Sequence, residues 1–145
     1  MTNLSEHFTL EELTHTDHRE FDNTPNESEL SNLKRLAAFL EEVKTVSGGK
    51  PVMVNSAFRS KLVNDAVGSK DTSQHRSGCA ADIRVPGMTP DEVVKAVIAS
   101  GIGYDQIIRE FDRWTHVSIS NTQDSKPRKM ALIIDKKGTR PYRQG

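Results

Sequence analysis

The feature that most constrains this chain is the ten-residue run from Ser73 to Asp82, which reads Ser-Gln-His-Arg-Ser-Gly-Cys-Ala-Ala-Asp. Six residues separate His75 from Asp82, and Gly78 lies between them. A glycine lets the backbone turn sharply, and residues 80–85 then alternate in the manner of a strand, with Asp82 on the face opposite the apolar residues. A loop histidine and a strand aspartate can therefore converge on one point.

A second histidine, His116, lies near the start of another strand-like run. Residues 104–110 and 115–120 both have strand character, and the short segment 111–114 between them predicts a β-hairpin. Two imidazoles and one carboxylate match the three protein ligands that many catalytic zinc sites use, with a fourth position left for water. The candidate ligands for one metal ion are His75, Asp82 and His116.

Helix signals surround these strand-like runs. Helices are expected to begin at the caps Thr9 and Thr89, and a longer amphipathic helix follows residues 25–29 and ends at Gly48. Further strands are expected at residues 51–56 and 130–135. Because the helices and strands do not alternate regularly, the sequence predicts an α+β fold, a small antiparallel sheet with helices packed on it.

The length of 145 residues favours a single domain over residues 1–145. We expect an N-terminal helical segment at about residues 8–50, a metal-site core at about residues 51–135 and a short basic tail at residues 136–145. The chain has 20 basic and 20 acidic residues, so no overall charge attracts it to nucleic acid or to an anionic membrane. We expect a monomer that does not bind nucleic acid.

The sequence also bears on the compartment. No apolar run reaches the length of a membrane span, and the first residues lack the basic and apolar regions of a secretory signal. Cys79 is the single cysteine, which fits a reducing compartment. We expect cytoplasmic synthesis without a signal peptide and without membrane insertion.

Taken together, the motifs resemble the peptidase M15 family. This family includes zinc D-Ala-D-Ala carboxypeptidases and the peptidase endolysins of bacteriophages, and its metal site is shared with the hedgehog signalling domain. The resemblance covers roughly residues 8–120. It is carried by Ser73-x-His75-x-x-Gly78-x-Ala80-x-Asp82, by Trp114-x-His116, by the segment 55–60 and by the segment 8–13, which is similar to the N-terminal segment of the phage-type branch.

The resemblance implies one zinc ion, held by His75, Asp82 and His116. It also implies that Arg59 lies beside the substrate and pairs with a carboxylate or with the developing oxyanion, for which a planar and permanently charged guanidinium is well suited. Ser73 and Gln74 either hydrogen-bond the substrate, orient the first histidine or cap the loop backbone. Trp114 either lines the cleft or packs the hairpin onto the core, and packing is preferred.

A zinc peptidase further needs a general base, a carboxylate that takes a proton from the attacking water and passes it to the leaving amine. Many family members have an acid three residues before the last histidine, where this sequence has Arg113. Some relatives, including hedgehog-type sites, have a glutamate at the spacing of Glu110. Along one extended strand Glu110 and His116 would lie about 20 Å apart, so only a hairpin can bring them together. We predict Glu110 as the base, with Asp112 as the alternative.

The implied function is hydrolysis of the stem peptides of bacterial peptidoglycan. Without a signal peptide, the preferred identity is a phage endolysin, which accumulates in the host cytoplasm and acts on the cell wall after release. The phage-type segment favours an L-alanyl-D-glutamate endopeptidase. The alternatives are a D-Ala-D-Ala carboxypeptidase of the same family and, from a different class, a zinc-stabilised binding module without turnover.

Overall fold

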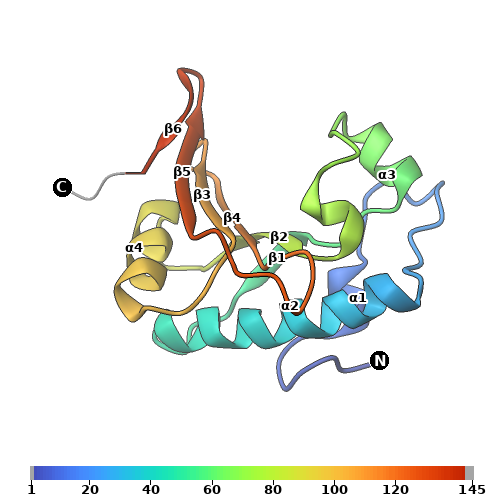
Figure 1. Ribbon diagram of the computed structural model, residues 1–145, viewed down its shortest axis with the longest axis horizontal. Coiled ribbons are helices and arrows are strands. Elements are labelled where there is room, and N and C mark those ends of the chain that lie inside the picture. Colours follow the sequence, from blue (N-terminus) through green and yellow to red (C-terminus); the bar gives the residue numbers. More distant parts are fainter. Residues whose placement is uncertain (1, 143–145) are drawn as a thin grey trace.

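The structure, a computed structural model, describes residues 2–142 and combines helices with one six-stranded sheet (Figure 1). The helices are α1 (Leu10–Leu13), α2 (Glu27–Val46), α3 (Lys61–Ala66) and α4 (Pro90–Ser100), with a short 3₁₀ helix, η1 (Gln74–Ser77). The strands are β1 (Met53–Ser56), β2 (Ala80–Arg84), β3 (Gln106–Glu110), β4 (Trp114–Ser118), β5 (Met130–Asp135) and β6 (Gly138–Pro141).

Local cap signals determine where the helices begin. Thr9, Asn26 and Thr89 each form a capping box, in which the side-chain oxygen of the cap accepts a hydrogen bond from a backbone N–H in the first turn and a glutamate side chain accepts one from the backbone N–H of the cap. The side chain of Ser60 caps α3 by accepting a hydrogen bond from a backbone N–H, but α3 has no glutamate that completes a capping box. At the other end of α4, Gly101 has a φ of 78°, a conformation that glycine adopts readily. The helix predictions are confirmed.

The strands follow the order β1-β2-β4-β3-β5-β6. Every neighbouring pair is antiparallel except β3 and β5, so the predicted α+β class is confirmed with one parallel pair added. The parallel direction follows from the approach to β5: the N–H groups of Lys129 and Met130 donate to the carbonyls of Tyr104 and Asp105, which places the start of β5 beside the start of β3.

The segment expected to be a basic tail, residues 136–145, is partly a strand. Residues 138–141 form β6, which pairs with β5, and the two strands extend from the body as a ribbon (Figure 1). All four residues of β6 are exposed, so no apolar pattern sets its register, which follows from its pairing with β5. Residues 143–145 of the expected tail lie outside the described residues.

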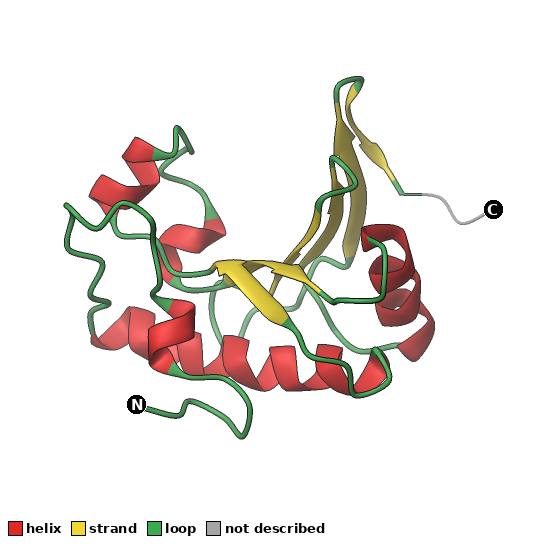
Figure 2. Ribbon diagram, turned by 180° about the vertical axis from the view of Figure 1, so that it is seen from behind, coloured by secondary structure: helices red, strands yellow, loops and turns green. Residues whose placement is uncertain are grey.

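The hydrophobic core lies between the sheet and the two longer helices. Figure 2 shows the sheet strongly twisted, with α2 running across one end and α4 beside it. Fully buried side chains from all three meet there, among them Leu36 and Leu40 of α2, Val94 and Val97 of α4, and Ile83, Ile107 and Val117 of the sheet. Alternation along the strands leaves the remaining residues of β2, β3 and β4 on the opposite face.

Cys79 lies just before β2 and is enclosed by the fold. Its thiol is fully buried, and burial raises its pKa. Within residues 2–142, no helix combines the length and the apolar character that crossing a membrane requires.

Candidate active site

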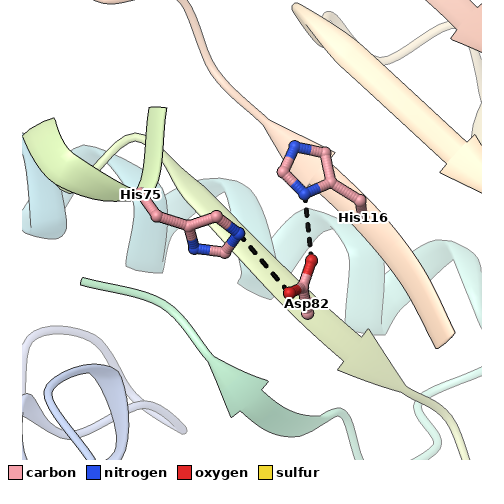
Figure 3. Close-up of side chains that lie close together, drawn as sticks. All are labelled: His75, Asp82 and His116. Atoms are coloured by element: carbon pink, nitrogen blue, oxygen red, sulfur yellow. Dashed lines mark hydrogen bonds and ion pairs between the residues drawn. The ribbon is translucent and has the colours of Figure 1, made fainter. Parts of the chain in front are cut away.

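The pairing of β2 with β4 places Asp82 directly opposite His116 on one face of the sheet. The Nδ1 atom of His116 lies 2.9 Å from Oδ1 of Asp82. His75, from η1, approaches the same carboxylate from the other side, with its Nε2 3.5 Å from Oδ2 (Figure 3). One ligand atom from each of the three residues lies within 4.8 Å of the others, so the structure brings all three predicted ligands together.

The turn between His75 and Asp82 depends on Gly78. Its φ is 79°, and a Cβ atom at this position would lie 2.9 Å from the backbone oxygen of Glu29 and 3.1 Å from Cγ of Leu33. At the start of η1, the hydroxyl of Ser73 accepts a hydrogen bond from the backbone N–H of His75. The backbone conformation and this cap together set the direction in which the first histidine points.

The hydrogen bonds of His75 leave one ring nitrogen available for a metal. Nδ1 lies 2.7 Å from the carbonyl oxygen of Ala57, which can only accept, so Nδ1 carries the proton and Nε2 has the lone pair in the neutral ring. Burial lowers the pKa of His75 and outweighs the opposing effect of Asp82, which favours this neutral form. A lone pair and a carboxylate that face each other are stabilised by a cation, so the donor set fits a divalent metal ion.

Asp82 is ionised despite being buried. Burial by itself raises the pKa of the carboxyl, but interactions with the imidazoles of His116 and His75 outweigh it and hold the pKa well below its usual range. Arg59 adds a further contact, with Nη2 3.2 Å from Oδ2 of Asp82, while its Nε donates to the hydroxyl of Ser56 at 3.0 Å. The carboxylate is therefore ready to ligate a cation and also fixes the guanidinium beside the site.

The hairpin predicted from the sequence brings Glu110 to the same cavity. In the β3–β4 register, Ile108 faces His116 and Glu110 faces Trp114, so Glu110 is a diagonal neighbour of His116 on the same face of the sheet. A cavity of about 530 Å³ joins these groups. Its lining includes the three candidate ligands together with Arg59, Ser73, Glu110 and Trp114.

The environment of Glu110 raises the pKa of its carboxyl. Burial is the main cause and the negative charge of Asp82 adds to it, while His116, Trp114 and Arg59 oppose the shift. A carboxyl whose pKa lies closer to neutrality both accepts and returns a proton more effectively than an ordinary glutamate. The position and the pKa of Glu110 both suit a general base.

Two predicted site residues lie elsewhere. Asp112 is exposed in the hairpin turn, where its carboxylate forms an ion pair with Arg109, and it lines a different cavity. The side-chain amide of Gln74 donates to Oδ2 of Asp105 at 3.0 Å and to the carbonyl of Ile119 at 2.9 Å, and it does not line the metal-site cavity. Among the open alternatives for Gln74, the contacts favour a structural one, a link between η1 and the residues that flank β3 and β4.

Trp114 is a cavity residue, although the sequence favours a packing role for it. It lines the metal-site cavity, and its buried Nε1 has no hydrogen-bond partner of normal geometry among the described residues. The signal that could have revealed it is spacing, because residues two apart in a strand share a face and Trp114 lies two before His116. Residues 67–69, at the end of α3, also line the cavity and had no signal in the sequence.

The fold and the site together define an α+β domain with a His-Asp-His group that could hold a metal ion. The family described as peptidase M15 matches residues 6–118, and the chain belongs to this family. The protein is therefore a peptidase of a typically metal-dependent kind. The matched residues contain every candidate site residue and end with β4, before β5 and β6. No curated protein matches the chain.

Proposed function

We propose that this protein is a zinc metallopeptidase that hydrolyses the stem peptides of bacterial peptidoglycan, as an L-alanyl-D-glutamate endopeptidase of the phage endolysin type. The observation that carries the proposal is one cavity that contains the three candidate ligands, Arg59 and Glu110. Two imidazoles and one carboxylate form a ligand set common in catalytic zinc sites. As an endolysin, the protein would be made in the cytoplasm and reach the wall after release, acting there as a monomer.

Each residue of the cavity has a task in this proposal. When bound, zinc supplies a Lewis acid that activates water and polarises the scissile carbonyl. Glu110 accepts the proton of the attacking water and returns it to the leaving amine. Arg59, fixed by Asp82 and Ser56, keeps further N–H donors for a substrate carboxylate or for the developing oxyanion. Stem peptides have free carboxylates, which suits an arginine in this position.

Replacement of Glu110 by Gln tests this function directly. The amide has the same shape but cannot accept the proton, so kcat for muropeptide hydrolysis should fall about 10²–10⁴-fold while the zinc content stays at one ion per chain. Products are identified by mass spectrometry, and zinc by elemental analysis. The matched control is Asp112→Asn, a similar change in the same hairpin but outside the cavity, which should keep nearly full activity.

The products also separate the alternatives. Cleavage between L-Ala and D-Glu supports the endopeptidase, whereas release of the terminal D-Ala alone would identify a carboxypeptidase. If the wild-type protein contains zinc and cleaves no wall peptide, the proposed wall-peptide hydrolysis is wrong and the zinc-stabilised binding module is the favoured alternative.

A further inference from the structure

A second cavity lies at the tip of the β3–β4 hairpin and shares one lining residue with the metal-site cavity. It has a volume of about 350 Å³ and is lined by Phe111, Arg113, Trp114 and Lys136. Trp114 lines both cavities, so this one residue borders each of them. We refer to it as the hairpin cavity.

The hairpin cavity combines aromatic surface with positive charge. The ring of Phe111 lies against Trp114, with 6.3 Å between the ring centroids, yet Phe111 is 45% exposed. Arg113 and Lys136 are exposed, and neither forms an ion pair with any residue in the range 2–142. Two cations without acidic partners beside an apolar face fit a ligand that carries an anionic group next to an apolar portion.

The backbone at Phe111 is strained in a way that core packing does not explain. Phe111 and Asp112 have φ values of 52° and 54°, and the N–H of Arg113 donates to the carbonyl of Glu110 at 3.0 Å, as in a type I′ turn. Such turns favour asparagine and glycine, and an aromatic residue there costs free energy. Strain of this kind concentrates at binding and catalytic sites. The strained backbone holds the ring of Phe111 exposed at the hairpin tip, where a ligand can contact it.

The other wall of the hairpin cavity comes from residues beyond the family match. Lys136 lies in the turn that joins β5 to β6, whereas the match ends at residue 118. The C-terminal ribbon also supports the hairpin, because the N–H of Phe111 donates to the carbonyl of Ile134 at 2.8 Å. This cavity therefore depends on a part of the chain that the family match does not include. Figure 1 shows that part, β5 and β6, beside β3 and β4.

We propose that the hairpin cavity is a substrate subsite that binds a free carboxylate of the stem peptide, through Arg113 and Lys136, while the adjoining part of the peptide lies against Phe111 and Trp114. The enzyme then selects wall peptides by the state of this carboxylate, free or amidated. The inference rests on the proposed function, because it concerns the substrate of the same site.

The first test compares two forms of each stem peptide, with free and with amidated carboxylates at the D-Glu residue and, separately, at the third residue. Lys136→Gln and Arg113→Gln should each raise KM for one free-carboxylate peptide about two- to five-fold and leave kcat and zinc content unchanged. On the matching amidated peptide the variants should equal the wild type. The position at which the difference disappears identifies the carboxylate. Lys137→Gln, the same change at the next residue and outside the hairpin cavity, should leave KM unaltered.

The second test separates binding from folding. Phe111→Asn removes the ring and suits the left-handed conformation, so the thermal midpoint should rise by about 3 °C while KM for the free-carboxylate peptide increases. An unchanged KM in the Lys136 and Phe111 variants, or equal losses on free and amidated peptides, would overturn the subsite and leave the peptidase proposal intact. If the wild-type protein cleaves no wall peptide, both proposals fail.

Discussion

Asp82 is the residue on which the other polar groups of the site converge. Its Oδ1 contacts Nδ1 of His116, and its Oδ2 lies 3.5 Å from Nε2 of His75 and 3.2 Å from Nη2 of Arg59. In the proposed function, one side chain is thus both a candidate metal ligand and the anchor of the guanidinium that we assign to the substrate. A single carboxylate would then couple metal binding to substrate orientation.

Glu110 gives a pH prediction at the same scale. Only its ionised form accepts a proton, and burial together with Asp82 raises its pKa above the ordinary value of 4.5. We expect kcat/KM to decrease as the pH falls through this raised pKa, with the acid limb of the profile above pH 4.5. The measurement is kcat/KM against pH on a soluble muropeptide.

Zinc content must be followed over the same pH range, because ligands must be deprotonated to hold a metal ion and acid therefore also releases it. Activity that stays constant down to pH 4.5, the ordinary pKa of a glutamate, with zinc still bound, would exclude Glu110 as the base. If kcat/KM falls at the same pH as the zinc content, the acid limb of the profile reports protonation of the metal ligands rather than of Glu110.

Among the elements, η1 and the turn after it determine the spacing between the first two candidate ligands, His75 and Asp82. Gly78→Ala would place a methyl group against the backbone of α2 at Glu29 and against Leu33. Left-handed strain and overpacking together should lower the free energy of unfolding by about 2–4 kcal/mol and weaken zinc binding. Denaturation in urea and a zinc titration measure the two effects.

Gly49→Ala is the matched control. Gly49 has a φ of 76°, almost the same as Gly78, but a Cβ atom added there would have no neighbouring atom within 4 Å. Strain alone should cost about 1–2 kcal/mol with no effect on zinc. Equal losses for the two variants would show that the close contact at Gly78 does not matter.

The elements differ in how far the sequence could predict them. The helix caps at Thr9, Asn26 and Thr89 are signals contained within four residues, so the helices were predictable. The β3–β4 hairpin was predictable too, but its turn conformation was not, because Phe111 and Asp112 are not the asparagine and glycine that such a turn favours. The convergence of His75 and Asp82 was predictable because glycine and strand alternation restrict where these side chains can point, whereas their role as metal ligands stays a prediction.

For the molecule as a whole, the sequence pattern did not predict which strands distant in the chain pair with each other. The parallel contact of β5 with β3 joins residues that are far apart in the chain, such as Gln106 and Met130, and no local signal marks it. The short, exposed β6 has no apolar alternation to reveal it. The side chain of Gln74 points toward Asp105 rather than toward the metal site. This direction could not be predicted either, because Asp105 becomes a neighbour of Gln74 only in the folded chain.

The whole-molecule prediction concerns the C-terminal ribbon. A variant that ends at Lys129 lacks β5 and β6, leaves β3 as an edge strand and loses the five register pairs between β3 and β5. At about 0.2–1 kcal/mol for each pair, the free energy of unfolding should fall by about 1–5 kcal/mol. Thermal unfolding and kcat/KM on muropeptides check this. A truncated protein with the stability and activity of the full chain would show that the ribbon is dispensable.

The burial of Cys79 has a practical consequence for all of these experiments. The chain has one cysteine, and its thiol is fully enclosed with a raised pKa, so it reacts slowly with alkylating reagents. A cysteine introduced on the surface would then be the only thiol that a fluorophore or spin label modifies in the folded protein. The native chain therefore needs no cysteine removal before a probe is attached beside the hairpin tip.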